Sequence, residues 1–407
     1  MRVLQVTHQY RPAVGGAELA VTCLAEELAR RGHRVTVLTS RSRDYLTWRD
    51  ELPARELLDG VDVRRFHSWP RGPRTWRLLN TALDRYRRRR ARVWEPLIFL
   101  GNGPLCPRLF RAVWQEAPLY DLLHINNLHY SHAALAYAAA RRRGLPVVLT
   151  PHVHLDQPAT YDVGYMWTVL RGSDHVIADT PAERAFLLEA GLSPQRVTTA
   201  GVGVRLERLP VRDRRACRRE LGLPDNGFVL LFLGRQTEYK GLELLLGTVA
   251  ALRAHLPRLC LLVVGPLTDH ARALWQRYDG LPGLINLGPV PDATRLAALN
   301  ACDCLALPST GEAFGIVYLE AWAVGKPVIA ARTPAAASLI DDRRDGFLVP
   351  PEDVVALAEC VLRLAQNPSL GRAMGERGQQ KARQRYTVSH ITDIVEGVYR
   401  RVLRRRG

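Results

Sequence analysis

The sequence predicts an α/β fold with two parallel-sheet domains. Short apolar runs that suit β-strands alternate with amphipathic helical patterns along the 407 residues, as in repeated βαβ units. A chain of this length is longer than one hydrophobic core usually supports. A polar, basic and proline-containing stretch at 205–226 separates two such series. We therefore expect two similar sheets that face each other across a cleft, where ligands commonly bind.

The first series is expected to form a domain over residues 1–205. A region at about 70–115 is rich in tryptophan and arginine and is expected to be a basic insertion. Helical patterns cover Ala17–Arg31, Ser131–Arg143 and Pro181–Ala190. Strands are predicted near Val3–Thr7, Val35–Thr39, Asp62–Phe66, Leu122–Ile125, Val147–Thr150, Val176–Ala178 and Val197–Thr199.

The second series is expected to form a domain over residues 206–370. It opens with the continuous apolar run Phe228–Leu233, which is typical of a parallel strand buried on both faces. Helices are expected over 371–407, and the last of them is expected to cross back to the first domain. Further strands are predicted near Leu259–Val264, Ile285–Leu287, Cys304–Leu307, Val328–Ala330 and Phe347–Val349.

The composition is that of a globular cytoplasmic protein. The apolar fraction is 47% and the charged fraction is 24%, which are ordinary values. No apolar run reaches the length of a membrane-spanning helix, and the first residues show no signal-peptide pattern. The seven cysteines have unrelated spacings, which favours reduced thiols. Cys302 and Cys304 lack the second cysteine pair that a zinc site of this type needs.

The formal net charge of +17 is concentrated in three arginine-rich segments, 85–92, 212–219 and 400–406. A nucleic acid, an anionic membrane surface and a polyphosphate substrate are all electrostatically compatible with this charge. No helix-turn-helix, zinc-finger or RNA-binding signature accompanies it. The sequence therefore predicts no specific nucleic-acid partner.

Two glutamates flank a glycine after the apolar run that ends at Pro308-Ser309. Glu312 is predicted to lie on a loop at a strand end, and Gly315 to let a ligand approach the backbone closely. Glu320 is predicted to lie on the following helix, whose free first amides would form an anion site. A ligand with phosphate and hydroxyl groups suits this pattern. Taken alone, a helix cap and a solvated glutamate explain it equally well.

A second motif, Gly234-Arg-Gln-Thr-Glu-Tyr-Lys-Gly241, follows the strand run Phe228–Leu233. Arg235 and Lys240 are therefore expected just beyond the carboxyl end of a strand, where open α/β sheets bind ligands. The planar fork of an arginine and the point charge of a lysine together suit a diphosphate. Two surface cations in a turn are the alternative, and the presence of both motifs in one α/β unit argues against it.

In the order and spacing of its motifs, the chain resembles family-4 retaining glycosyltransferases of the GT-B fold, almost from end to end. Where the family commonly has Asn-Gly-Val-Asp, this sequence departs from it, with Ala200 and Arg205 around the segment. The motifs that carry the resemblance are Gly15-Gly16-Ala-Glu18, Leu149-Thr-Pro-His152, Gly172–Thr180, Gly201–Val204, Gly234–Gly241, Glu312–Glu320 and Asp345–Asp353.

The resemblance implies two Rossmann-like domains, of which the second binds a nucleotide-diphosphate sugar. Arg235 and Lys240 would then neutralise the diphosphate and stabilise the leaving group. Glu320 would hydrogen-bond the ribose, and Glu312 would position the hydroxyls of the donor sugar. Retention would follow from attack on the same face as the departing phosphate. The backbone of Gly288-Pro-Val290 would meet the base, and Phe314, Gly315, Ile316 and Val317 would complete the donor site.

Histidines follow two of the strands predicted in the first domain. The resemblance implies that His152 points into the cleft near the transferred sugar, with His154 as the alternative two residues on. His124 and His129 flank another strand end, and packing or capping is the favoured interpretation for both. His152 is thus the predicted catalytic histidine.

The glycine pair Gly15-Gly16 is expected in the turn after the first strand, before an amphipathic helix. A glycine pair most often indicates only a turn. At this position it would also let a phosphate or an acceptor approach closely, and Glu18 would help to hold the acceptor.

No two aspartates are separated by a single residue, so the sequence lacks the Asp-x-Asp pair with which many other glycosyltransferases hold Mg²⁺ or Mn²⁺. Asp341-Asp342 adjoin each other in a polar turn, and a solvated loop is the favoured interpretation. We expect no required metal and no cofactor.

The basic insertion is the expected place of the acceptor. Trp76, Tyr86 and Trp94 alternate there with arginines, a pattern that suits an anionic bilayer surface or a lipid-phosphate acceptor. A solvated helix packed on the first domain is the equal alternative. A sugar, lipid-linked or polysaccharide acceptor is expected, with the protein in the cytoplasm at the inner face of the cell membrane.

Two other functions are compatible with parts of this pattern. A GT-B relative that acts as an epimerase or a phosphorylase is one, although no lysine shows a pyridoxal-binding context. A catalytically inactive scaffold that binds membrane or nucleic acid through its arginines is the other. Intact Arg235, Lys240, Glu312 and Glu320 favour a transferase over both.

Overall fold

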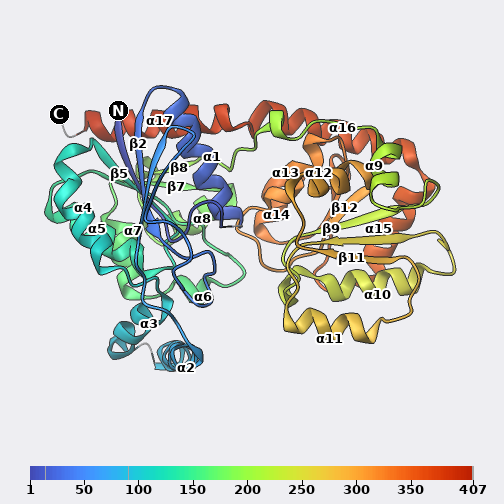
Figure 1. Ribbon diagram of the computed structural model, residues 1–407, viewed down its shortest axis with the longest axis horizontal. Helices are drawn as coiled ribbons and strands as arrows, with labels where there is room; N and C mark the ends of the chain where they lie inside the picture. The colour runs from blue at the N-terminus through green and yellow to red at the C-terminus, as the bar shows by residue number, and fades with distance from the viewer. Residues whose placement is uncertain (14, 90, 406–407) are drawn as a thin grey trace. The chain divides into compact units, whose positions relative to one another are not determined.

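The computed structural model describes residues 1–13, 15–89 and 91–405, and the side chains of 158 and 159 are not described. The chain divides into two compact units. Unit 1 consists of Met1–Gly203 with Val388–Gly407, and unit 2 of Val204–Thr387 (Figure 1). The boundary between the first and second parts thus falls at Gly203, close to the expected 205.

Unit 1 is built on an eight-stranded sheet among the described residues, in the order β3-β4-β2-β1-β5-β6-β7-β8. All neighbouring strands are parallel except β3 and β4. The strand order reverses between β1 and β5, which creates a switch point at the carboxyl edge. The strands are β1 (Arg2–Val6), β2 (Arg34–Ser40), β3 (Arg55–Leu58), β4 (Val61–Phe66), β5 (Leu122–Asn126), β6 (Val147–Thr150), β7 (His175–Ala178) and β8 (Val197–Thr199).

Strand β3 was not predicted from the sequence. Its four residues, Arg-Glu-Leu-Leu, alternate between exposed and half-buried positions at the edge of the sheet. Such an edge strand needs no apolar run, because only one of its sides is paired. The other seven strands of unit 1 lie within a residue or two of the predicted positions.

The helices of unit 1 include three that form the basic insertion. Of the 17 residues of α2, only Leu79, Ala82 and Tyr86 are buried, so most of this helix faces away from the core. The helices are α1 (Gly16–Arg30), α2 (Pro73–Arg89), α3 (Glu95–Asn102), α4 (Pro107–Glu116), α5 (Ser131–Arg142), α6 (Pro158–Tyr161), α7 (Gly164–Gly172), α8 (Pro181–Glu189) and α17 (Val388–Arg404).

Unit 2 is built on a six-stranded sheet in the described part of the chain, in the order β11-β10-β9-β12-β13-β14. Every neighbouring pair is parallel, and the order reverses between β9 and β12. Figure 1 shows α10 and α11 on one side of this sheet and α12 and α13 on the other. The strands are β9 (Val229–Leu233), β10 (Cys260–Val264), β11 (Leu284–Gly288), β12 (Cys304–Leu307), β13 (Val328–Ala331) and β14 (Gly346–Val349).

The helices of unit 2 begin in the predicted linker, where residues 214–220 form α9. The stretch 205–226 is thus part of unit 2. The helices are α9 (Arg214–Glu220), α10 (Leu242–Leu252), α11 (Asp269–Arg277), α12 (Asp292–Ala301), α13 (Ile316–Ala323), α14 (Pro334–Leu339), α15 (Val354–Gln366) and α16 (Pro368–Arg385).

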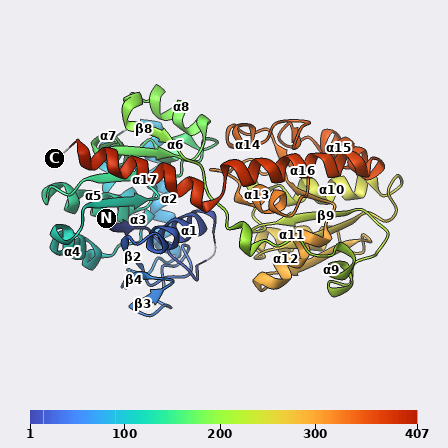
Figure 2. The ribbon, with the colours of Figure 1, turned by 90° about the horizontal axis from the view of Figure 1, so that it is seen from above.

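The expected C-terminal segment 371–407 does not form one part. Helix α16 packs on α13 within unit 2, whereas α17 packs on α1 within unit 1 (Figures 1 and 2). Arg31, next to α1, holds Asp393 of α17 at 2.6 Å, and the Tyr399 hydroxyl lies 2.7 Å from His124 Nδ1. The chain therefore passes from unit 2 to unit 1 between Thr387 and Val388.

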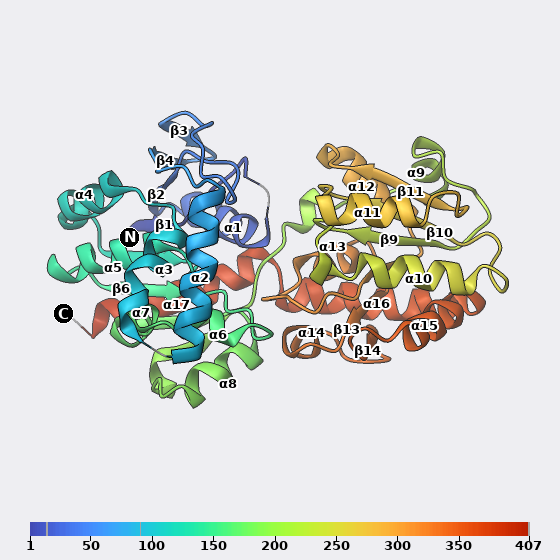
Figure 3. The ribbon, with the colours of Figure 1, turned by 90° about the horizontal axis from the view of Figure 1, so that it is seen from below.

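Two glycines of α16 let this helix approach the segment around α13 closely. Figure 3 shows the ribbons of α13 and α16 from the opposite side. A Cβ on Gly375 would lie 2.0 Å from the Gly325 carbonyl oxygen, and one on Gly378 would lie 2.1 Å from the Trp322 ring. By contrast, a Cβ on Gly371 would meet its nearest atom at 3.8 Å. The close packing of α16 on the segment around α13 thus requires glycine at 375 and 378 but not at 371.

We expect Gly375→Ala to destabilise unit 2 by about 2 kcal/mol, because the added methyl group forces the two segments apart. The measurement is urea denaturation followed by tryptophan fluorescence. The matched control is Gly371→Ala in the same helix, which should be neutral or stabilising by about 0.5 kcal/mol. Equal stabilities for the two variants would contradict the close packing at Gly375.

Candidate functional site

The two predicted donor motifs lie side by side at the carboxyl edge of the unit 2 sheet. Strands β9 and β12 are parallel neighbours at the switch point, so the loops that follow them leave the sheet together. The Thr310 backbone amide donates to the Tyr239 carbonyl oxygen at 2.8 Å, and Ser309 Oγ donates to the same oxygen at 3.1 Å. These bonds fix the two loops against each other.

An ion pair between Lys240 and Glu312 joins the two motifs directly. The Lys240 side chain is 15% exposed and that of Glu312 is 10% exposed. Burial alone would lower the pKa of Lys240, but the Glu312 carboxylate and the nearby Tyr239 outweigh burial and raise it. Lys240 is therefore a fixed cation at neutral pH. Arg235, half-buried in the same loop, adds a second positive side chain.

Glycine is required at two turns of this edge. Gly241 has φ 76°, and a Cβ there would lie 2.5 Å from the Pro308 carbonyl oxygen, so the two loops could not approach as closely. Gly315 has φ 92° and precedes the first residue of α13. Both backbone conformations lie in the left-handed region that favours glycine.

The start of α13 presents the amides of Ile316 and Val317 next to Glu312 in the chain. The first amides of a helix lack intrahelical acceptors and carry the positive end of its dipole, so they attract anions. Phe314 lies just before this turn and packs edge-on against Tyr386, with ring centroids 5.8 Å apart. Arg235, Lys240 and these amides thus make a positively charged edge.

Glu320 lies on α13 with its carboxylate against Arg295 of α12, Oε1 to Nη1 at 2.7 Å. Arg295 also contacts Asp292 at 2.6 Å. Burial raises the pKa of Glu320, and the neighbouring Arg295 opposes this rise. The sequence did not indicate Arg295, because it belongs to no recognised motif and reaches Glu320 only through the packing of two helices.

Gln236 was also missed by sequence reasoning, although it lies inside the Gly234–Gly241 motif. It is fully buried, and its Nε2 donates to the Gly265 carbonyl oxygen at 3.0 Å and to Asn286 Oδ1 at 3.0 Å. Its Oε1 accepts from Trp275 Nε1 at 2.8 Å. Gln236 therefore joins the loop that follows β9 to the loop that follows β10, to strand β11 and to helix α11. Its position between two predicted ligand residues was the available signal.

Val290 lies beyond β11, two strands away from β9 in the sheet. The Gly265 amide donates to the Gly288 carbonyl oxygen at 2.8 Å, so this segment is tied to the loop after β10. All the predicted donor residues, from Arg235 to Glu320, thus belong to one edge of unit 2.

In unit 1, His152 lies just beyond β6 with φ 52°, an uncommon conformation for a residue other than glycine. Its Nδ1 contacts Asp179 Oδ2 at 2.6 Å, and its Nε2 has no hydrogen-bond partner among the described residues. Burial alone would lower the pKa of His152, but Asp179, Glu183 and Glu18 outweigh burial and raise it. His154 is 40% exposed and lies 4.0 Å from Asp156.

Glu183 supports this arrangement from α8. Its two carboxylate oxygens accept from the backbone amides of Val153 at 2.8 Å and Asp179 at 2.6 Å. Burial and the nearby Asp179 charge raise the pKa of Glu183 to about 8. The loop that carries His152 and the loop that carries Asp179 are thus joined through one carboxyl group.

His124 and His129 differ in their surroundings. His124 is fully buried and bonded at both ring nitrogens, to Tyr399 at 2.7 Å and to Thr150 Oγ1 at 2.8 Å, as the packing interpretation expects. Burial lowers its pKa to about 3. His129 Nδ1 instead has no partner within the described residues, so packing and capping do not fully account for this side chain.

Gly15 and Gly16 form the start of α1, as N-cap and first helical residue. A Cβ on Gly15 would lie 2.1 Å from Glu18 Oε2, so the glycine leaves space for that carboxylate. Glu18 Oε1 contacts His8 Nε2 at 2.8 Å. The structure therefore places Glu18 over the start of its own helix and beside His8.

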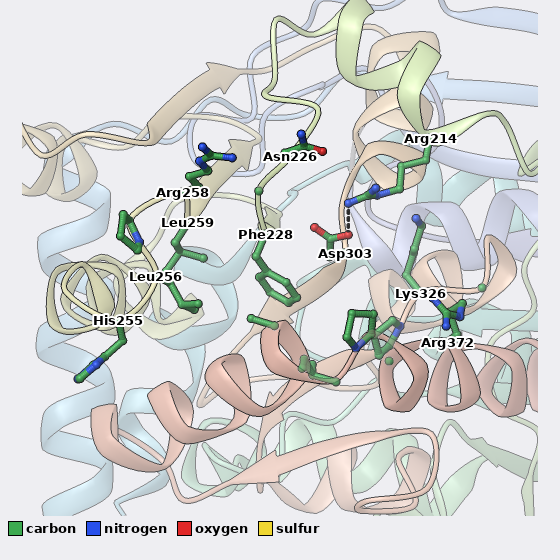
Figure 4. A pocket seen from close by; sticks show the side chains of 18 residues that line it. Arg214, Asn226, Phe228, His255, Leu256, Arg258, Leu259, Asp303, Lys326 and Arg372 are labelled. Carbon is green, nitrogen blue, oxygen red and sulfur yellow. Dashed lines mark hydrogen bonds and ion pairs between the residues drawn. The ribbon is translucent and has the colours of Figure 1, made fainter.

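A cavity of about 710 Å³ lies at the opposite edge of the unit 2 sheet (Figure 4). It surrounds Asp303, which precedes β12 and contacts Arg214 and Arg218 at 2.6 Å each. None of the predicted donor residues lines it. Because Glu312 follows the carboxyl end of the same strand, this cavity and the predicted donor residues lie at opposite ends of β12.

Among the described residues, no group of three or more histidine, cysteine, aspartate or glutamate side chains has an arrangement that could hold a metal ion. Nor is any of the described helices both long and apolar enough to cross a bilayer.

We expect Asp179→Asn to cost about 3 kcal/mol of stability at pH 6, because it leaves the buried His152 imidazolium without its partner. In the wild type, the raised pKa of His152 gives stability below about pH 6.5 that is lost as pH rises through the folded-state pKa. The raised pKa of Glu183 acts in the same direction. The cost of the substitution should therefore shrink by pH 9.

The measurement is chemical denaturation of both proteins at pH 6 and pH 9. Asp174→Asn is the control, because Asp174 accepts from the Val147 amide at 2.8 Å and pairs with an arginine, Arg141. Its cost should be the same at both pH values. A cost of Asp179→Asn that is independent of pH would refute the charge coupling.

Comparison with known proteins agrees with the predicted class. Residues 14–208 match the family model described as Glycosyltransferase Family 4, and residues 227–367 match the one described as Glycosyl transferases group 1. D-inositol 3-phosphate glycosyltransferase of Saccharomonospora viridis is 30% identical, over 96% of this chain and 90% of the relative. D-inositol 3-phosphate glycosyltransferase 2 of Catenulispora acidiphila is 32% identical, over 90% and 86%.

Solved structures share the fold. Sucrose-phosphate synthase of Thermosynechococcus elongatus superposes with a TM-score of 0.78 at 21% identity, covering 98% of both chains. Anabaena Alr3699/HepE in complex with UDP and glucose has a TM-score of 0.73 at 22% identity, covering 98% of this chain and 99% of that one. With the two parallel sheets and the matched family regions, the chain belongs to glycosyltransferase family 4 and is a glycosyltransferase of the GT-B fold.

Proposed function

We propose that the chain transfers a sugar from a nucleotide-diphosphate sugar to an acceptor hydroxyl, with retention of anomeric configuration and without a required metal. The observation that carries this proposal is the edge of unit 2, where Arg235, the Lys240–Glu312 pair and the start of α13 meet. That edge offers two cations and a helix N-terminus to a diphosphate. It also offers the Glu312 carboxylate to the sugar hydroxyls on one side of the diphosphate and the Glu320 carboxylate to the ribose hydroxyls on the other.

Each group has a role that follows from its chemistry. Arg235, Lys240 and the amides of Ile316 and Val317 balance the charge that grows on the leaving phosphate, which is the role that a metal ion has in other transferases. Glu320, held by Arg295, accepts hydrogen bonds from the ribose hydroxyls. The backbone at Val290 meets the base. Glu312 orients the sugar hydroxyls while it holds Lys240.

Retention would follow from attack by the acceptor hydroxyl on the face from which the phosphate leaves. The departing phosphate takes the acceptor proton, so no carboxylate nucleophile is required. His152 contributes its Nε2, which has no hydrogen-bond partner among the described residues and can therefore exchange a hydrogen bond with a sugar hydroxyl.

The acceptor is proposed to be a hydroxylated ring that carries a phosphate, either free or linked to a lipid. The first alternative is supported by relatives named D-inositol 3-phosphate glycosyltransferases. The second is supported by the exposed arginines of α2 and the net charge of +17, which favour the inner face of an anionic membrane. A polysaccharide end that bears such a group has the same chemistry.

We expect one nucleotide class among UDP-, GDP-, ADP- and TDP-sugars to stabilise the chain in EDTA. A ligand at about 100 times its Kd adds about 2.7 kcal/mol to the free energy of unfolding, measured as a shift in Tm. UDP is the first candidate, because the fold neighbour from Anabaena was crystallised with UDP-glucose. Arg235→Ala should abolish the shift, whereas Arg219→Ala, an exposed arginine on α9, should leave it intact.

No shift with any nucleotide in EDTA, followed by a shift when Mg²⁺ is restored, would refute metal independence. An unchanged shift in Arg235→Ala would remove that residue from the phosphate site. No shift under either condition, in folded protein, would leave only a non-catalytic role.

We expect a donor with an α-configured sugar to give an α-linked product. The measurement is the anomeric coupling constant of the purified product by proton NMR, recorded before any anomerisation of free sugar. A β-linked product would overturn retention while leaving sugar transfer in place.

A further inference from the structure

The cavity around Asp303, at the amino-terminal edge of the unit 2 sheet, takes no part in the proposed reaction. Its volume is about 710 Å³, and helices α15 and α16 form one of its walls (Figure 4). Phe228, Asp303 and Lys326, which precede β9, β12 and β13, contribute to the lining. Cavities of this size bind small organic ligands, so the chemistry of the lining can indicate a ligand.

The lining carries a surplus of positive charge. Among the described residues, it includes four lysine or arginine side chains and one carboxylate, that of Asp303. Asp303 is already paired with Arg214 and with the fully buried Arg218, at 2.6 Å each. The surplus therefore remains available to an anion. The four basic residues are Arg214, Arg258, Lys326 and Arg372.

Lys326 is a half-buried cation without a carboxylate partner in the part of the chain that the structure describes. Its Nζ donates to the Cys302 carbonyl oxygen at 2.8 Å. Burial lowers the pKa of Lys326, with a smaller contribution from Arg214 and Arg218. An ammonium group that is partly removed from water is stabilised by an opposite charge. An anion in the cavity would supply that charge.

Two further cations lie close to Lys326 at one end of the cavity. Figure 4 shows Arg214 and Arg372 on the same side of Phe228 as Lys326. Arg372 is exposed and has no ion pair within the described residues. Arg214 binds Asp303 through Nη2, but its buried Nε has no acceptor among the described residues. Three cations in one place favour the dianion of a phosphate monoester over a singly charged carboxylate.

The remainder of the lining is largely apolar. Leu256 and Leu259 lie on the other side of Phe228 from the three cations (Figure 4). Leu364 of α15 and Pro327 add aliphatic surface. An inorganic anion would leave these side chains in contact with water, whereas an aliphatic chain would cover them, which is favourable. The cavity thus has a cationic end and an apolar end.

We propose that this cavity binds an organic phosphate that carries an aliphatic chain. The phosphate lies among Arg214, Lys326 and Arg372, and the chain lies along Phe228 and Leu256. All the lining residues belong to unit 2, and the site lies at the opposite end of β12 from the donor residues. It is therefore a second ligand site that is distinct from the donor site.

Gly371 of α16 allows the cavity to be filled without removal of any existing group. It lines the cavity, and a Cβ built on it would lie 3.8 Å from Leu364 Cδ2 and from Pro327 Cγ, which belong to two other lining residues. These distances are ordinary contacts. A leucine at this position would therefore fit the helix and occupy the space that the chain of the ligand needs.

The experiment measures binding of hexyl phosphate, 1-hexanol and inorganic phosphate to the full chain by calorimetry. We expect hexyl phosphate to bind at least about tenfold more tightly than either of the other two, because it alone engages both ends of the cavity. Arg372→Gln should weaken hexyl phosphate about tenfold, since it removes a charge that has no protein partner. The matched control is Arg383→Gln, an exposed arginine of α16 outside the cavity, which should bind as the wild type does.

Gly371→Leu should abolish binding of hexyl phosphate, whereas Gly371→Ala should retain it. Arg372→Gln decides the question if Gly371→Leu lowers the Tm, because the Arg372 side chain is exposed. Equal affinities for hexyl phosphate and inorganic phosphate would overturn the proposal. So would binding that neither Arg372→Gln nor Gly371→Leu changes. Loss of binding in Arg235→Ala would place the phosphate at the donor site instead.

A soluble ester and a membrane lipid can both present a phosphate on an aliphatic chain. Sedimentation with vesicles of phosphatidic acid, compared with vesicles that contain the same fraction of phosphatidylglycerol, distinguishes the two sources. A preference for phosphatidic acid that is lost in Gly371→Leu supports a lipid ligand. Equal sedimentation with both vesicles, together with binding of hexyl phosphate, supports a soluble ester.

Discussion

The candidate donor site depends on the ion pair between Lys240 and Glu312, because each of these largely buried charges would be costly without the other. The pair can form because β9 and β12 are parallel neighbours and their loops emerge at one edge. It keeps a cation in place before any ligand arrives, so little rearrangement is needed to receive a phosphate. A diphosphate would then share Lys240 with Glu312 and release part of the carboxylate to other hydrogen-bond donors.

In unit 1, the buried ionisable groups at the sheet edge are a histidine and two carboxyl groups. His152 pairs with Asp179, and Glu183 accepts from the backbone amides of Val153 and Asp179. The pKa values of His152 and Glu183 are both raised. At the edge of unit 2, burial would lower the pKa of Lys240, but Glu312 outweighs burial and raises it, so the lysine stays charged at neutral pH. Charge at His152 therefore varies with pH, while charge at Lys240 does not. The pH dependence of a reaction that required both residues would therefore follow the titration of His152.

The sequence predicted those parts of the candidate site that follow from strand patterns and from the topology of a parallel sheet. Continuous apolar runs predicted β9 and β12, and the rule that parallel strands end at the same edge brought Arg235, Lys240 and Glu312 together. Contacts between helices could not be predicted in this way, because the pairing of Glu320 with Arg295 depends on how α12 and α13 pack. For the same reason, the sequence did not reveal the hydrogen bonds of Gln236 or the orientation of Asn102. Their partners lie far away in the sequence.

The basic insertion and the edge of unit 2 differ in how many of their side chains are fixed by other parts of the protein. Helix α2 contributes only three buried residues to the core, so most of its side chains can change at little cost in stability. Arg71, which precedes α2, is held more firmly, because its guanidinium ties the segments at Tyr45 and Gly101 to Trp76. By contrast, the edge of unit 2 has no such freedom, since its charged residues are held by each other and by the backbone of adjacent strands.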